Sequence, residues 1–173
     1  KNPIFAKNKI MIFITGCTGL LGSHLVAEIV KGQKSKVKSQ IKLLCRKNSD
    51  LSLLKKVLSR YGFDEIPNNI EFVYGDVLDY DVLEEAMRDV DEVYHCAAVV
   101  SFDTSDKNSL MRVNVEGTKN MVNAALQCGV KKFCHVSSIA ALGRALEGET
   151  IDENSPWTHS KNNSVYSSSY HEG

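Results

Sequence analysis

A glycine-rich stretch near the N-terminus, TGCTGLLG (15–22), has the residue types and spacing of a phosphate-binding loop. Gly16 suits the positive φ of a turn that leaves a strand, Gly19 lets a pyrophosphate approach the backbone, and Gly22 lets the next helix pack closely. The helix N-terminus adds unpaired N–H groups and the positive end of a dipole. We therefore predict a pyrophosphate site made of Gly16, Thr18, Gly19, Leu20, Leu21 and Gly22.

Strand-length apolar runs alternate with helical patterns along the chain, and these elements must position the loop. The apolar runs are 10–14, 41–45, 70–74, 92–98 and 131–136. Most are continuously apolar, which is typical of strands covered on both faces. The helical patterns are 19–31, 50–60, 80–88 and 105–128. This alternation predicts right-handed βαβ units in an α/β, doubly wound parallel sheet with strand order 3-2-1-4-5.

The composition excludes several classes of protein. The chain is 43% hydrophobic, which is enough for a core, and its 21 Lys and Arg balance its 21 Asp and Glu, which argues against a nucleic-acid surface. No apolar run approaches the roughly 18 residues of a membrane span. The five cysteines lack C-x-x-C pairing and are interpreted as core residues of a reducing compartment, without a metal site. We expect a cytoplasmic protein that contacts neither nucleic acid nor membrane.

Five motifs together resemble the extended short-chain dehydrogenase/reductase superfamily, that is, the NAD-dependent epimerase/dehydratase family with its dihydroflavonol-reductase-like members. They occur in the family's order and are TGCTGLLG (15–22), YGDVLD (74–79), HCAAVV (95–100), NVEGT (114–118) and VSSIAALG (136–143). The resemblance spans roughly residues 9–169. It implies one NAD(P)-binding Rossmann domain over 1–173, incomplete because the family's C-terminal substrate-binding part is absent.

The resemblance also assigns roles along the cofactor. Asp76 would hydrogen-bond the adenine and Val77 would line its face, while Asn114 would reach toward the nicotinamide end. The remaining predicted cofactor residues are Ala97, Ala98 and Ser137. His95, which precedes the two alanines, is interpreted as a structural histidine at a strand end rather than as a catalytic base.

The choice between the two nicotinamide cofactors depends on the end of the second strand. An acidic residue there would bind the ribose 2′-hydroxyl of NAD, but this sequence has Arg46 followed by Lys47. A guanidinium suits bidentate phosphate contacts. We therefore predict NADP(H) as the preferred cofactor, with NAD(H) as the alternative that an arginine stacked on the adenine would tolerate.

The resemblance implies a catalytic Ser–Tyr–Lys trio, in which lysine lowers the pKa of the tyrosine. Ser138 matches the serine, with Ser137 as runner-up, and Tyr166 matches the tyrosine of Y-x-x-x-K. Tyr170 stands where the lysine is expected. Alternatively Tyr170 is the catalytic tyrosine, and its lysine would follow the last residue of the sequence.

Three interpretations of this missing lysine stay open: a non-catalytic cofactor-binding protein, a true truncation, or part of a longer protein with a segment absent near 167–170. We favour the third and expect a break in the chain shortly after Tyr166.

The leading functional expectation is an NADP(H)-dependent oxidoreductase that interconverts a carbonyl and a secondary alcohol of a small-molecule substrate. The alternatives are a nucleotide-sugar epimerase or dehydratase with bound NAD, and a non-catalytic NAD(P)-binding protein. The family resemblance also admits a homodimer.

Overall fold

The computed structural model describes residues 9–32, 38–142, 150–159 and 163–173. The strands are β1 (Lys9–Thr15), β2 (Lys38–Cys45), β3 (Ile70–Tyr74), β4 (Glu92–His95) and β5 (Lys132–His135). The α-helices are α1 (Leu20–Gly32), α2 (Ser52–Arg60), α3 (Tyr80–Met87), α4 (Lys107–Leu110), α5 (Thr118–Gln127) and α6 (Val165–Glu172). Short 3₁₀ and π segments are η1 (Thr104–Asp106), η2 (Met111–Gly117) and η3 (Ile139–Leu142).

The strands form one parallel sheet in the order β3-β2-β1-β4-β5, which confirms the predicted Rossmann topology. The register brings the C-terminal ends of the strands together, because Thr15 of β1 lies opposite both Leu44 of β2 and His95 of β4. His95 in turn lies opposite His135 of β5. The strands β2 and β3 lie on one side of β1, and β4 and β5 lie on the other side. Sheets of this kind bind ligands where the strand order switches sides, which is here between β1 and β4.

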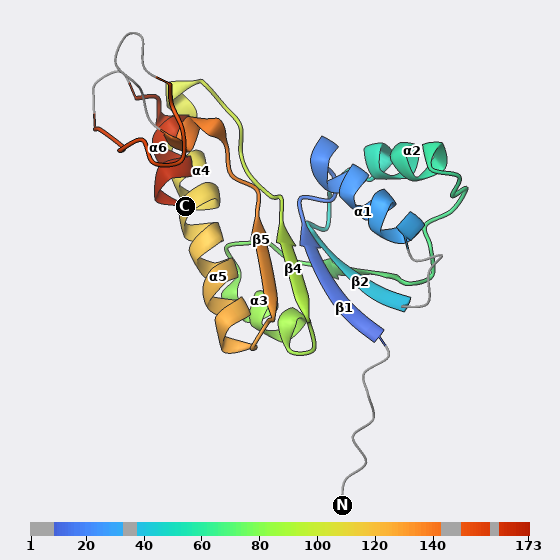
Figure 1. Cartoon of the computed structure of the whole chain (residues 1–173). Helices are drawn as coiled ribbons and strands as arrows, with labels where there is room; N and C mark the ends of the chain where they lie inside the picture. Colours follow the sequence, from blue (N-terminus) through green and yellow to red (C-terminus); the bar gives the residue numbers. More distant parts are fainter. Residues whose placement is uncertain (1–8, 33–37, 143–149, 160–162) are drawn as a thin grey trace, which may run out of the picture.

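Helices cover both faces of the sheet, with α1 and α2 on one face and α3 and α5 on the other (Figure 1). The side chains of alternate β1 residues pack on opposite faces of the sheet. Ile12 and Ile14 belong to the core under α1 and α2, whereas Phe13 belongs to the core under α3 and α5. Burial on both faces explains why the strand sequences are continuously apolar.

The long helix predicted at 105–128 is present, but it is not a single regular α-helix. The segment η2 is a π-helix that joins α4 to α5 and contains Asn114. The Thr118 hydroxyl donates to the Asn114 carbonyl oxygen at 2.7 Å, and a side chain that takes part in the backbone ladder is a known cause of such irregularity. Gly129, with φ of +69°, follows the end of α5 as expected for a C-terminal stop.

Candidate functional site

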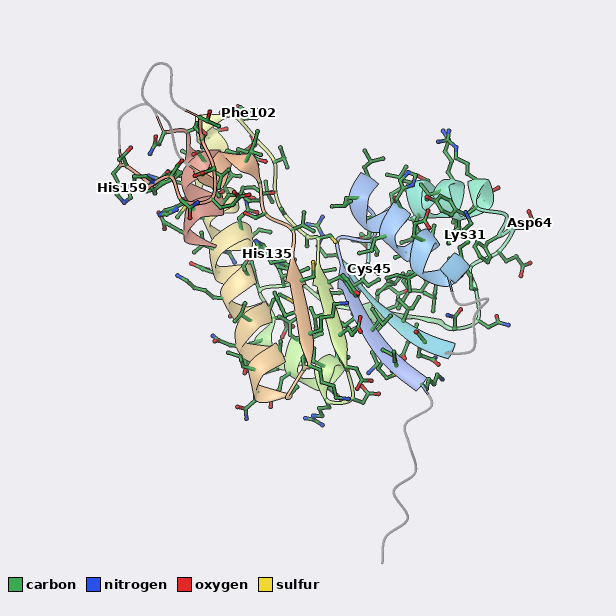
Figure 2. All side chains as sticks on the ribbon, in the orientation of Figure 1. Lys31, Cys45, Asp64, Phe102, His135 and His159 are labelled. Atoms are coloured by element: carbon green, nitrogen blue, oxygen red, sulfur yellow. The ribbon has the colours of Figure 1, made fainter. Side chains whose placement is uncertain are left out.

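A cleft opens at the C-terminal edge of the sheet, above the ends of β1, β2 and β4, and Figure 2 shows Cys45 near this edge. Its walls contain a large part of the predicted cofactor site, namely Gly16, Thr18, Gly19, Arg46, Asp76, Val77, Ala97 and Ala98. Sequence reasoning did not single out the other lining residues, which are Thr15, Leu44, Cys45, Ser49, Gly75, Cys96, Val99 and Val113. Thr15, Gly75, Cys96 and Val99 lie inside the predicted motifs, and Leu44 and Cys45 end a predicted strand, so their position in the sequence was the signal that could have indicated them.

The glycine loop packs directly against the backbone that follows β4. Gly16 has φ of +72°, and a Cβ there would lie 2.6 Å from the Cys96 carbonyl and 2.7 Å from the Ala97 nitrogen. A Cβ on Gly22 would overlap the Gly16 carbonyl oxygen, so the close contact of Gly22 is with the loop rather than with the sheet. The loop can keep this shape only with glycine at both positions.

The predicted loop residues that follow Gly19 do not line the cleft with their side chains. Leu20 and Leu21 are 70% and 55% exposed, and Gly22 is buried behind the loop. The amides of the first turn of a helix have no partner within the helix. These three residues would therefore serve a phosphate through their backbone N–H groups at the start of α1, not through their side chains.

Tight turns hold Arg46 and Asp76 at the cleft. The Arg46 N–H donates to the Ser49 hydroxyl at 3.1 Å, and the Ser49 N–H donates to the Arg46 carbonyl at 2.9 Å. The Asp76 carboxylate accepts from the Leu78 N–H at 3.0 Å. The Arg46 side chain is exposed and can reach a ligand in the cleft.

Asn114 lies beside the cleft rather than in its wall. Its amide oxygen accepts from the Val99 N–H at 2.8 Å, and its amide nitrogen donates to the Val99 carbonyl and to the Ser169 hydroxyl, each at 3.0 Å. Both amide hydrogens are therefore used inside the protein. The side chain thereby joins the loop after β4 to α6. Asn114 also borders a small cavity with Ala97 and Ala98, and its reach toward the nicotinamide stays a prediction.

The two predicted catalytic hydroxyls do come together. The Tyr166 hydroxyl of α6 lies 3.4 Å from the Ser138 hydroxyl at the start of η3. The Ser167 hydroxyl donates to the Ala140 carbonyl at 2.8 Å and fixes α6 against η3. Ser138 is the serine that approaches Tyr166, whereas Ser137 is exposed, so the geometry favours Ser138 over this runner-up.

The expected break after Tyr166 is wrong, because Val165–Glu172 forms one unbroken helix. The Ser164 hydroxyl caps it by accepting from the Ser167 N–H at 3.0 Å. Tyr166 and Tyr170 lie one turn apart with ring centres separated by 4.8 Å. Burial, together with the neighbouring Tyr166, raises the pKa of Tyr170 to about 12.

The cysteines fit their predicted role only in part. Cys17 and Cys45 are buried, but Cys134 is exposed, so the expectation of a core position is wrong for Cys134. Burial raises the pKa of Cys17 to about 12, which makes its thiolate scarce at neutral pH.

His95 is fully buried behind the cleft, and both of its ring nitrogens have hydrogen-bond partners. Burial, with a smaller contribution from His135, lowers the pKa of His95 to about 3. The histidine is therefore neutral at physiological pH, as its interpretation as a structural residue requires.

This burial predicts a pH-dependent stability. The unfolded chain binds a proton at His95 near pH 6.5 and the folded chain does not, so stability is complete above about pH 6.5 and falls as the pH drops toward 3. We expect His95→Gln to reduce the slope of unfolding free energy against pH by up to about 1.4 kcal/mol per pH unit between roughly pH 4.5 and 6. Urea unfolding at several pH values measures this slope. An unchanged slope in the variant would show that His95 is protonated in the folded protein.

The family model of the NAD-binding domain described as male sterility protein matches residues 14–170. The chain belongs to this family. It is 32% identical over 146 residues to sterol demethylase protein B of Methylococcus capsulatus, covering 84% of this chain and 38% of that protein. It is 30% identical over 141 residues to a putative dihydroflavonol 4-reductase of Synechocystis, covering 82% of this chain and 36% of the relative.

Solved structures agree with this assignment. DesIV, a dTDP-glucose 4,6-dehydratase from Streptomyces venezuelae solved with NAD and TYD bound, superposes with a TM-score of 0.78 at 26% identity, covering 94% of this chain and 49% of that one. The resemblance to extended short-chain dehydrogenases/reductases is thus confirmed, and the chain is an NAD(P)-binding domain of an oxidoreductase and dehydratase family. It spans less than half the length of these relatives. Within the described residues, no helix is both long and apolar enough to cross a membrane.

Proposed function

We propose that the chain is the cofactor-binding part of an NADP(H)-dependent oxidoreductase that interconverts a carbonyl and a secondary alcohol. The main support for the proposal is the approach of the Tyr166 and Ser138 hydroxyls to 3.4 Å. Tyr166 lies on α6, whose Ser169 and Tyr170 share a small cavity with Ala97 and Ala98 of the glycine-loop cleft. A dinucleotide fits that cleft chemically. Gly16 and Gly19 present backbone without a Cβ to the cleft, and the first turn of α1 offers N–H groups to phosphates.

The bound nicotinamide would supply or accept the hydride. Hydroxyl groups of the chain would bind the substrate oxygen and exchange a proton with it. Ser138 would donate a hydrogen bond to that oxygen, and Tyr166 would pass a proton to it or take one from it. The Phe102 ring, 80% exposed and 5.3 Å from the Tyr166 ring, gives this place an apolar wall. Figure 2 shows Phe102 beside α6.

Tyr170 is the second candidate for the proton donor, because it borders a small cavity shared with Ala97 and Ala98 of the cofactor cleft. Its pKa of about 12 makes it harder to ionise than an ordinary tyrosine. A neighbouring positive charge would be needed to lower this pKa. We therefore rank Tyr170 below Tyr166.

The predicted preference for NADPH depends on Arg46. We expect NADPH to bind more tightly than NADH, and Arg46→Ala to weaken NADPH binding by roughly tenfold to a hundredfold, which is the usual cost of losing a charged hydrogen bond. NADH binding should barely change. Dissociation constants from nicotinamide fluorescence measure both effects.

Lys47→Ala is the matched control, because Lys47 is also exposed and basic but does not line the cleft. It should leave the preference for NADPH intact. Equal affinities for the two cofactors in the unmodified protein would reject the role of Arg46.

A second function, a nucleotide-sugar dehydratase or epimerase with bound NAD, is favoured by the likeness to DesIV. Purified protein that already carries NAD would support it over the oxidoreductase. A third function is non-catalytic NAD(P) binding. It is supported by Tyr170, which stands one helical turn after Tyr166 at the position expected for a lysine. A cytoplasmic location, a small-molecule substrate and a homodimer remain predictions.

A further inference from the structure

A chain of buried polar groups runs behind the cleft from β1 to the π segment η2. Thr15, His95, Thr118 and Asn114 are each at most 4% exposed. The Thr15 hydroxyl lies 2.7 Å from Nδ1 of His95, and Nε2 of His95 lies 3.2 Å from the Thr118 hydroxyl. The Thr118 hydroxyl lies 2.7 Å from the Asn114 carbonyl oxygen.

The proton positions along this chain follow from its chemistry. The Asn114 carbonyl can only accept, so the single hydrogen of the Thr118 hydroxyl points to it. Thr118 must then accept from Nε2–H of His95. A neutral imidazole carries one hydrogen, so Nδ1 accepts the Thr15 hydroxyl hydrogen, and the Thr15 oxygen is left to accept from the Ala97 N–H at 3.1 Å.

The two ends of the chain lie in different parts of the site. Ala97 belongs to the wall of the cofactor cleft. Asn114 bonds through its amide to Ser169 on α6, and its carbonyl lies against Gly173, where a Cβ would overlap it. Ser169 in turn donates to the Tyr166 carbonyl at 2.9 Å. A displacement at Ala97 can therefore be passed to the helix that carries Tyr166.

We infer that His95, as the Nε2–H tautomer, is a positioning residue that couples the cofactor-contacting backbone at Ala97 to the tyrosine helix α6 through Thr118 and Asn114. The inference rests on the proposed function. A histidine suits this place because its ring presents an acceptor and a donor on opposite sides of a rigid plane. A protonated ring would donate from both nitrogens and would force Thr15 to turn away from its present bond.

The tautomer can be measured directly by nitrogen NMR of histidine-labelled protein. We expect a protonated Nε2 and an unprotonated Nδ1 at His95, unchanged from pH 8 down to roughly pH 5, where an ordinary histidine titrates. A protonated Nδ1, or a titration within this range, would overturn the inference. This result does not depend on cofactor binding.

The coupling can be read from Trp157, the single tryptophan of the sequence, which stacks on His171 of α6 with ring centres 4.1 Å apart. NADP⁺ should change the tryptophan emission of the unmodified protein, and this oxidised cofactor does not absorb that emission. Thr118→Val keeps the shape of the side chain but loses both hydrogen bonds. It should bind NADP⁺ within about threefold of the unmodified protein and lose most of the emission change.

Thr118→Ser is the rescue control, since it keeps the hydroxyl and should restore the emission change. An emission change that persists in Thr118→Val, or one that Thr118→Ser fails to restore, would overturn the coupling. NADP⁺ binding without an emission change in the unmodified protein would overturn it as well. If NADP⁺ does not bind at all, the proposed function is wrong and the coupling is wrong with it. The measurement of the His95 tautomer would still be valid.

Discussion

Gly16→Ala is expected to raise the dissociation constant for NADPH by more than about 100-fold, which corresponds to about 2.7 kcal/mol. The new Cβ would lie 2.6 Å from the Cys96 carbonyl, so the loop after β1 and the backbone after β4 would have to separate. Both segments line the cofactor cleft. The positive φ of Gly16 adds strain of roughly 1–2 kcal/mol to the folded state.

Gly129→Ala is a closely matched control for this variant. Gly129 has φ of +69°, close to the +72° of Gly16, but a Cβ there would meet nothing within 4 Å. It carries the same conformational strain without the collision and lies far from the cleft, after α5. We expect a stability loss of about 1 kcal/mol and an unchanged affinity for NADPH. Equal affinities in the two alanine variants, measured by calorimetry, would show that the glycine loop does not shape the cofactor site.

Tyr166→Phe is expected to lower kcat by roughly 10²–10⁴-fold, because it removes the hydroxyl that lies 3.4 Å from Ser138 and would exchange a proton with the substrate. The ring and its contacts with Phe102 and Tyr170 would remain. The KM for NADPH should stay within a few-fold, since neither hydroxyl lines the cofactor cleft. Steady-state oxidation of NADPH by the full-length protein, with ketone substrates, measures both constants.

Tyr170→Phe decides which tyrosine is the proton donor. We expect a loss of less than about tenfold from this variant, because Tyr170 would act only through its contact with Tyr166. Tyr74→Phe removes the hydroxyl of an exposed tyrosine on β3 and should leave kcat unchanged. A near-normal kcat in Tyr166→Phe combined with a large loss in Tyr170→Phe would assign the proton transfer to Tyr170.

The strand order and the place of the cleft could be predicted from the sequence because they depend on local patterns. Continuous apolar runs identify strands buried on both faces, and Ile12, Phe13 and Ile14 show why, since consecutive residues serve opposite cores. The glycine spacing identifies the turn after β1, because Gly16 needs both its positive φ and the missing Cβ. Parallel strands then bring the motifs that follow them to one edge.

The interior of the site could not be predicted, because it depends on contacts between segments far apart in the sequence. The role of Asn114 is set by Val99 and Ser169, and the π segment around it accompanies the bond from Thr118. A serine-rich end of the chain carries little helical propensity. It is nevertheless a helix here, because Ser164 caps it and Ser169 packs against Asn114.

The most direct test of the account is a calorimetric titration of the unmodified protein with NADPH and with NADH. The account predicts one saturable site per chain, with NADPH bound more tightly than NADH because Arg46 lies at the cleft wall after β2. Saturable binding of neither cofactor would contradict the assignment of the cleft as a dinucleotide site.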